Sequence, residues 1–193
     1  VTPDLLTAVG FIGSLLTLAG YALANLHPSY LWLASFGFIV NWFGDSLDGT
    51  LARHRKIERP IYGFYIDHSM DIIIEVLFFL GLGISPYVRF DLACLALIGY
   101  LMISNLVYIQ TSVMGEFRLS YAGLGPTEIR VLAIAANTAV FFAGNPRLTF
   151  LNFTNTVFDW IVIVVIFLLY AIFTISWLVN ARKLIGADRP FNK

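Results

Sequence analysis

The sequence predicts an all-α integral membrane protein, a multi-pass chain with six transmembrane helices. Of its 193 residues, 59% are hydrophobic and only 12% are charged, whereas soluble domains average about 25% charged residues. The 12 basic and 12 acidic residues balance, so net charge does not indicate a nucleic-acid partner. Because the apolar segments follow one another with short connections, we expect a single transmembrane domain over residues 1–193, embedded in the lipid bilayer.

The apolar segments predict individual membrane crossings, since a transmembrane helix needs about 20 mainly apolar residues. The first segment has no charge, while the second ends and the third begins in a stretch that contains carboxylates. The fifth is short and rich in alanine, which favours close packing of helices. The expected spans are residues 5–24, 30 to beyond 45, 63–84, 92–114, 127–143 and 156–178.

The basic residues indicate which side of the membrane the connections face. With both chain ends on one side, only Arg89 and Arg147 of the 12 basic residues fall on the opposite side. Lys and Arg concentrate in cytoplasmic connections. We therefore expect both termini in the cytoplasm, together with the basic turn at residues 53–60 and the carboxylates near it.

Four carboxylates lie inside this apolar chain, at the end of the second span and the start of the third. Asp45 and Asp48 are three residues apart and Asp67 and Asp71 are four apart, so each pair shares one face of its helix. The short turn between the spans makes the two helices antiparallel neighbours. A charge at the centre of a membrane helix costs about 2.5–3.5 kcal/mol. We therefore expect all four side chains to face a polar cavity at one depth.

This arrangement predicts a metal site for phosphoryl transfer. Four carboxylates that repel one another need countercharge, and hard oxygen ligands suit Mg²⁺ or Mn²⁺. Two divalent ions would balance the four charges, and a pair of metals about 3.5–4 Å apart can clamp a phosphoryl group during an in-line displacement. Gly49, Ala52 and Gly63 leave room for a ligand beside the carboxylates. Arg53 and its basic neighbours could dock a diphosphate.

These residues fit one family signature. With all eight fixed positions occupied, the chain resembles the CDP-alcohol phosphotransferases, also called CDP-alcohol phosphatidyltransferases, through the pattern Asp45-x₂-Asp48-Gly49-x₂-Ala52-Arg53-x₉-Gly63-x₃-Asp67-x₃-Asp71. The stretch from Pro3 to Thr7 is similar to the family's usual Pro-Asn-x-x-Thr start, with Asp4 in place of Asn. The resemblance implies six transmembrane helices, a homodimer and a two-metal site that opens to the cytoplasm.

The resemblance also implies a role for each residue of the pattern. The four aspartates would hold two divalent ions, and Asp71 would in addition act as the general base toward the acceptor hydroxyl. Gly49, Ala52, Arg53 and Gly63 would line the pocket for the cytidine diphosphate group. The acceptor oxygen would attack the β-phosphorus, and CMP would leave.

Gly125–Arg130 is the second informative stretch. Pro126 and Glu128 are ordinary signals for the start of a helix, but Gly-Pro-Thr-Glu also resembles a segment of choline and ethanolamine phosphotransferases. Arg118 and Arg130 could bind a phosphate on the acceptor, or could simply be basic residues of the cytoplasmic side. The candidate residues for the acceptor or head group are therefore Glu128, Arg118 and Arg130.

Three functions remain open at this point. We expect transfer of a phosphatidyl group from CDP-diacylglycerol to a small polar alcohol in phospholipid biosynthesis. The alternative within the same class is transfer from CDP-choline or CDP-ethanolamine to diacylglycerol. The alternative from another class is an ion-coupled transporter, which would need a continuous polar path across the bilayer. The first and sixth spans and the outer halves of the second and third show none.

Glu75 continues the stripe of acidic residues on the third span. It lies eight residues beyond Asp67, or about 12 Å along a helix. That distance is too long for a shared metal, so we expect a buried glutamate that is hydrogen-bonded or lies at an interface.

Overall fold

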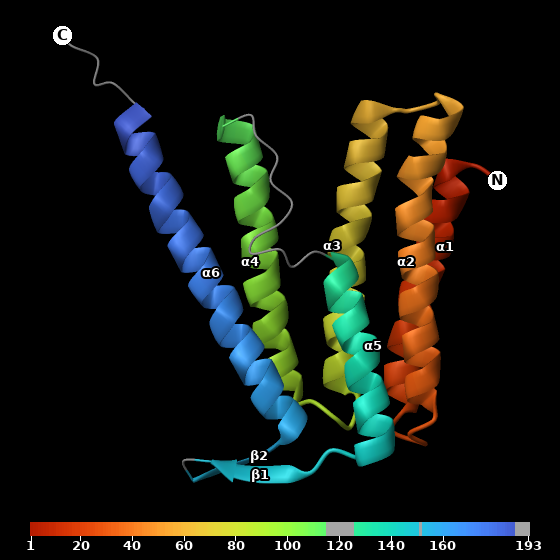
Figure 1. Cartoon of the computed structure of the whole chain (residues 1–193), viewed down its shortest axis with the longest axis vertical. Helices are drawn as coiled ribbons and strands as arrows, with labels where there is room; N and C mark the ends of the chain where they lie inside the picture. Colours follow the sequence, from red (N-terminus) through yellow and green to blue (C-terminus); the bar gives the residue numbers. More distant parts are fainter. Residues whose placement is uncertain (115–125, 151, 188–193) are drawn as a thin grey trace.

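The computed structural model describes residues 1–114, 126–150 and 152–187. In this part of the chain, six helices form an elongated bundle and two short strands form an antiparallel hairpin at one end of it (Figure 1). The elements, in order, are α1 (Pro3–Leu23), α2 (Tyr30–Arg55), α3 (Pro60–Ile84), α4 (Phe90–Met114), α5 (Pro126–Ala143), β1 (Arg147–Phe150), β2 (Phe153–Thr156) and α6 (Val157–Ala187).

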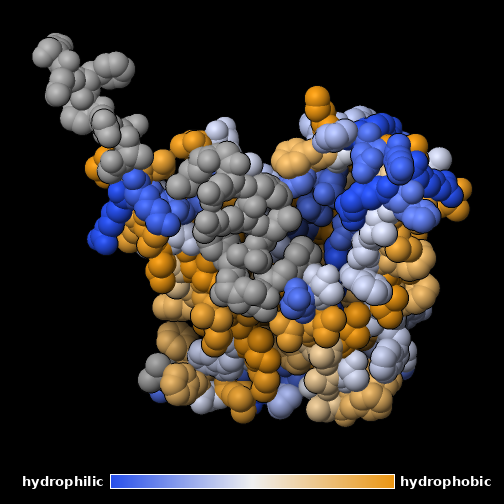
Figure 2. Space-filling view, turned by 45° about the horizontal axis from the view of Figure 1, so that its top comes forward, coloured by the Kyte–Doolittle hydropathy of each residue, from blue (hydrophilic) through white to orange (hydrophobic). Residues whose placement is uncertain are grey.

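The predicted helical membrane fold is confirmed. Helices α1, α4 and α6 are each long and apolar enough to cross a membrane. Helices α2 and α3 contain the predicted aspartates, and α5 has only 18 residues, near the lower limit of about 17 for a crossing. Figure 2 shows hydrophilic residues gathered at the end with the α2–α3 turn and hydrophobic residues over the sides of the bundle.

The hairpin between α5 and α6 was not predicted from the sequence. It follows Gly144, which has a φ of 72°, and Asn152 in its turn has a φ of 66°. Both residues lie in the left-handed region, which glycine and asparagine tolerate best. The chain can therefore turn sharply at both positions before α6 begins. The threonines and phenylalanines of the segments on either side of Asn152 favour strands.

Helices α1 and α2 pack with their backbones in contact, because glycines face each other along the pair. A Cβ atom added to Gly44 would lie 2.3 Å from the backbone nitrogen of Gly10, and one added to Gly20 would lie 2.3 Å from that of Ala34. Small residues allow such close approach in membranes. Asn41 strengthens the contact by donating from Nδ2 to the carbonyl oxygen of Gly10 at 3.0 Å.

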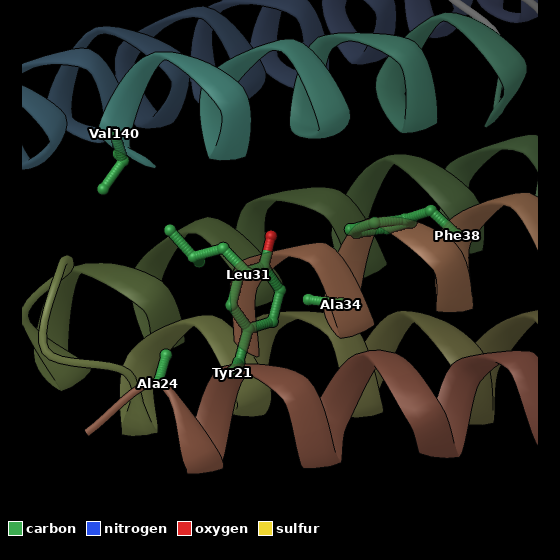
Figure 3. Close-up of a cluster of buried hydrophobic side chains, with 6 residues drawn as sticks. All are labelled: Tyr21, Ala24, Leu31, Ala34, Phe38 and Val140. Carbon is green, nitrogen blue, oxygen red and sulfur yellow. The ribbon is translucent and has the colours of Figure 1, made fainter. Parts of the chain in front are cut away.

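A buried cluster joins α5 to this pair (Figure 3). Within it, the hydroxyl of Tyr21 donates to Oδ1 of Asn137 at 3.1 Å, and Nδ2 of Asn137 donates to Oγ of Ser35 at 3.1 Å. One asparagine on α5 is thereby bonded to both α1 and α2. The apolar members of the cluster are Tyr21, Ala24, Leu31, Ala34, Phe38 and Val140.

Candidate active site

The four predicted aspartates line one small pocket between α1, α2 and α3. Thr7 and Gly10 of α1 and Met70 and Ile74 of α3 complete its lining. The free volume is about 10 Å³, which is about the minimum for one water molecule. Helical spacing puts each pair on one helix face, and α1 packs against both α2 and α3. Helices α2 and α3 have few close contacts with each other, so α1, rather than the predicted direct pairing of these two helices, brings the aspartates together. Carboxylates line this pocket, whereas the sides of the bundle are mostly apolar (Figure 2).

The turn between α2 and α3 is short and well fixed. Lys56 ends α2 in the left-handed conformation, with a φ of 55°, and its backbone N–H bonds to carbonyl oxygens of the last turn. Pro60 occupies the first turn of α3, where its missing N–H is not needed. The chain therefore reverses direction within residues 56–59, which puts both aspartate pairs at the same end of the bundle.

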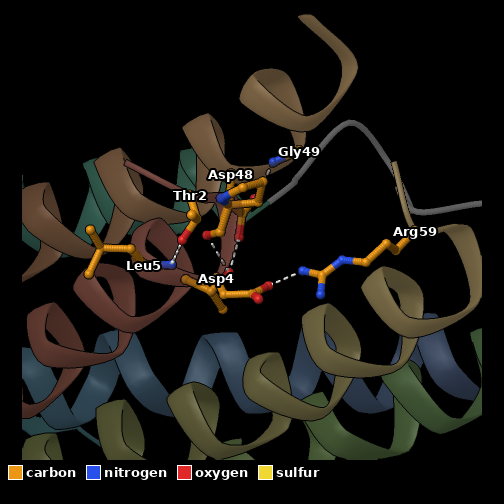
Figure 4. A network of polar contacts seen from close by, with 8 residues as sticks. Thr2, Asp4, Leu5, Asp48, Gly49 and Arg59 are labelled. Carbon is orange, nitrogen blue, oxygen red and sulfur yellow. Dashed lines mark hydrogen bonds and ion pairs between the residues drawn. The ribbon is translucent and has the colours of Figure 1, made fainter. Parts of the chain in front are cut away.

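The basic residues near this turn hold the start of α1. Arg59 forms an ion pair with Asp4 (Figure 4), and Nη1 of Arg55 donates to the carbonyl oxygen of Val1 at 2.7 Å. Asp4 is the residue at which the chain departs from the family's usual asparagine. Here it pairs with Arg59 of the α2–α3 turn, which ties the beginning of α1 to that turn.

Asp48 is oriented by a residue of α1. The hydroxyl of Thr7 donates to Oδ2 of Asp48 at 2.7 Å, and the same hydroxyl lies 3.3 Å from the carbonyl oxygen of Pro3. A hydrogen bond to a carboxylate holds it in one rotamer and stabilises its charge. Sequence reasoning assigned no role to Thr7, although it closes the Pro-x-x-x-Thr start that resembles the family.

Asp45 is paired with a residue of α5. Oδ2 of Asp45 lies 2.8 Å from Nη2 of Arg130, whose side chain is 7% exposed, while that of Asp45 is 27% exposed. Helix α5 begins near mid-height of α2 and α3 in Figure 1, which brings its first turns to the level of the pocket. Arg130, predicted as a possible acceptor residue, therefore lies at the aspartate site itself.

The second aspartate pair lies on α3. Asp67 is exposed, with Oδ2 3.8 Å from Nδ1 of His68, whereas Asp71 is partly buried one turn farther along the helix. The ring of His68 stacks on Phe64 with 4.0 Å between centroids. Asp67 is thus at the mouth of the pocket, and Asp71 lies deeper in it.

The residues predicted for the nucleotide border open space beside the pocket. A Cβ atom added to Gly63 would meet nothing within 4 Å in the described structure, and one at Gly49 would lie 3.3 Å from Nη1 of Arg53. Arg53 is exposed and donates from Nη2 to Oγ1 of Thr50 at 3.3 Å. Ala52 is partly buried on the same helix. Their position leaves room for a ligand, and their role stays a prediction.

The predicted acceptor residues do not all fall in the described part of the chain. Glu128 is exposed in the first turn of α5, two residues before Arg130. Arg118 lies in residues 115–125, outside the described structure. Of these candidates, the structure therefore brings Arg130 to the aspartates.

Comparison with known proteins agrees with this geometry. Residues 1–180 match the CDP-alcohol phosphatidyltransferase family, and this range includes every residue of the pocket. The chain belongs to this family. The resemblance found in the sequence is thereby confirmed, and the family places the helical bundle in a membrane.

A curated relative of this family member is the archaetidylinositol phosphate synthase of Pyrococcus horikoshii. The two are 33% identical over 105 residues, a match that covers 54% of this chain and 52% of the relative. The match therefore spans about half the length of each protein.

Glu75 of this CDP-alcohol phosphatidyltransferase family member does not line the pocket. Its Oε2 atom is buried and has no hydrogen-bond partner among the described residues. Oε2 of Glu75 is therefore buried, as predicted, but within the described part of the chain it lacks the predicted hydrogen bond.

The residue types that line the pocket suit a divalent cation, but the distances between their side chains do not yet form a metal site. Four carboxylates line it, and such oxygen donors suit Mg²⁺ or Mn²⁺. In the described residues, however, no three Asp, Glu, His or Cys side chains are grouped closely enough to hold a metal ion. Asp45 is turned to Arg130 and Asp48 to Thr7. Chelation would therefore require these side chains to turn toward one another.

Proposed function

We propose that this protein transfers a substituted phosphate, most simply a phosphatidyl-type group, from a CDP-linked donor to an alcohol hydroxyl with release of CMP. The observation that supports this function is the convergence of Asp45, Asp48, Asp67 and Asp71 on one pocket in a chain that belongs to the CDP-alcohol phosphatidyltransferase family. Such a reaction would serve phospholipid biosynthesis in the membrane that holds the helices.

The four aspartates would hold two divalent ions, Mg²⁺ or Mn²⁺. When bound, such ions would neutralise the diphosphate of the donor and the repulsion among the carboxylates. The exposed Arg53 would bind the diphosphate at the pocket mouth, and the small residues Gly49, Ala52 and Gly63 would admit the nucleotide. This assignment relies on the open space beside Gly63 and on the position of Arg53 next to Gly49.

Asp71 would act as the general base. The acceptor oxygen forms a bond to the β-phosphorus while the bond from that phosphorus to the bridging oxygen breaks, and CMP leaves with the electron pair. The hydroxyl proton passes to a carboxylate oxygen of Asp71. The deeper position of Asp71 supports this role, because it keeps the carboxylate away from the exposed mouth at Asp67.

The acceptor is proposed to be a phosphorylated alcohol such as inositol phosphate. The name of the Pyrococcus horikoshii relative describes a product that contains archaetidyl, inositol and phosphate. In this chain, the buried guanidinium of Arg130 beside Asp45 offers positive charge for an acceptor phosphate at the reaction site. Glu128, in the first turn of α5, and Arg118 are the further candidates.

Release of CMP by the purified protein tests this function. The protein, reconstituted with Mg²⁺ or Mn²⁺, would be given CDP-diacylglycerol or CDP-archaeol with inositol phosphate, glycerol phosphate or unphosphorylated inositol in turn. We expect release of CMP only when one of these CDP-linked lipids is supplied together with a phosphorylated acceptor. CMP with CDP-choline and diacylglycerol would favour the aminoalcohol alternative, and no CMP with any pair would contradict the enzyme function and leave the transporter to be tested.

The orientation and assembly are proposed on the same basis. The start of α1 and the end of α6 lie at the same end of the bundle as the α2–α3 turn (Figure 1), and the basic residues of that end favour the cytoplasm. Labelling of single cysteines from either side of sealed vesicles would test this orientation. The homodimer implied by the family resemblance would be tested by light scattering of the protein in detergent.

A further inference from the structure

The β1–β2 hairpin lies at the end of the bundle opposite the aspartate pocket and projects sideways from the foot of α6 (Figure 1). Phe150 pairs with Phe153 and Thr149 pairs with Thr154 in its antiparallel register. Residues that pair directly share one face of a hairpin, and successive residues alternate between faces. One face therefore presents two phenylalanines, and the other presents two threonines.

The phenylalanine face is mostly apolar and largely exposed, although Asn155, the partner of Leu148, also lies on it. Leu148 extends it, and the exposed fractions of Leu148, Phe150 and Phe153 are 51%, 61% and 66%. On the opposite face, the hydroxyls of Thr149 and Thr154 are hydrogen-bonded to each other at 2.9 Å. A short hairpin with one apolar and one hydroxyl face fits the boundary between hydrocarbon and water better than either phase alone.

Contacts with α6 show which way the apolar face is directed. The ring of Phe150 packs edge-on against Trp160, with 5.7 Å between centroids, and Nε1 of Trp160 donates to the carbonyl oxygen of Leu148 at 3.2 Å. Trp160 lies in the first turn of α6, a helix apolar enough to cross a membrane and hardly buried within the protein. The apolar face of the hairpin is thus continuous with the apolar surface of α6.

The base of the hairpin is held rigidly by a buried carboxylate. Asp159 accepts hydrogen bonds from the backbone N–H groups of Arg89 at 2.9 Å and Thr156 at 3.1 Å. Nη1 of Arg89 also reaches Oδ1 of Asn155 at 3.3 Å. These bonds fasten β2 to the α3–α4 connection, so the hairpin cannot easily swing away from the foot of the bundle.

We propose that this hairpin is an interfacial anchor whose apolar face, formed by Leu148, Phe150 and Phe153, inserts into the boundary between lipid head groups and acyl chains. The occupant of this face is the lipid bilayer, because the face continues the apolar surface of α6. Tryptophan and tyrosine concentrate at this depth in membrane proteins, and Trp160 lies directly against the hairpin. The threonine face, turned the other way, is in contact with water and head groups, and the anchor fixes the depth at which α6 enters the membrane.

Site-directed spin labels on the two faces test the anchor. In a Cys94→Ala background, single cysteines replace Phe150 or Phe153 on the apolar face, and Thr149 or Thr154 on the opposite face as matched controls. The labelled protein is reconstituted into phosphatidylcholine and phosphatidylglycerol vesicles. Collisions of each label with oxygen, which dissolves in lipid, and with a water-soluble nickel chelate are then compared.

We expect the ratio of oxygen to nickel collisions to be several-fold higher for labels at the two phenylalanine positions than for labels at the two threonine positions. Leu148→Cys provides a further reporter on the apolar face if either phenylalanine variant is not recovered. Equal, water-like ratios at all positions would overturn the proposal by showing a hairpin that projects into water. Labels on the apolar face that neither reagent reaches would also overturn it, since protein would then cover that face. The anchor does not depend on the reaction at the other end of the bundle.

Discussion

Replacing Arg130 by methionine is expected to lower the free energy of unfolding by about 1–3 kcal/mol. The guanidinium pairs with Asp45 at 2.8 Å, and removing one partner of a fully buried pair costs about 3–5 kcal/mol because a charge is left uncompensated. Exposed pairs contribute only about 0–1 kcal/mol. The side chain of Arg130 is 7% exposed but that of Asp45 is 27% exposed. Water can therefore partly solvate the charge left on Asp45, and the expected loss of stability lies between the values for buried and exposed pairs.

A double-mutant cycle isolates this pair. Unfolding in detergent would be followed for the parent protein, Arg130→Met, Asp45→Asn and the double variant, with Arg147→Met as a control that removes an exposed arginine from the opposite end of the bundle. We expect the double variant to be less destabilised than the sum of the two single variants. A coupling energy below about 0.5 kcal/mol, the range for independent sites, would refute the stabilising role of the pair.

The same variants report on metal binding without any turnover. Once Arg130 is removed, Asp45 lacks its positive partner, and a divalent cation can supply the countercharge. Because a ligand that binds only the folded state raises stability, Mn²⁺ should raise the melting temperature of Arg130→Met more than that of the parent. An equal shift in both proteins would show that Arg130 and the cation do not share Asp45.

Three further substitutions probe the site and its support. Asp71→Asn should abolish CMP release while nucleotide binding, measured by equilibrium dialysis, is largely kept; a fully active variant would contradict its role as base. Thr7→Val removes the hydrogen bond to Asp48 and should weaken Mn²⁺ binding, measured by electron paramagnetic resonance, by about tenfold, with Thr7→Ser restoring it. Gly44→Ala places a Cβ atom 2.3 Å from the backbone nitrogen of Gly10 and should destabilise the protein by about 1–3 kcal/mol. The melting temperature would fall accordingly. Unchanged stability would contradict the close α1–α2 contact.

Much of the aspartate site could be predicted from the sequence, because it depends on local geometry. Spacings of three and four residues put each carboxylate pair on one helix face, and the short turn between α2 and α3 puts both pairs at one end of the bundle. The packing of α1 against both helices, which completes the pocket, could not be predicted in this way. The same reasoning failed for the hairpin, whose turns depend on left-handed conformations at Gly144 and Asn152. A glycine after a helix marks the end of that helix, but it does not show that two strands follow.

The sequence by itself determined the helices, the membrane environment and the four aspartates, since hydropathy and helical spacing are properties of neighbouring residues. Only the tertiary structure decided the partners of those aspartates. Thr7 lies 41 positions from Asp48, and Arg130 reaches Asp45 from another helix. Such contacts depend on how far one helix is rotated and shifted against the next, and here the glycine contacts of α1 with α2 and the buried cluster with α5 set those positions.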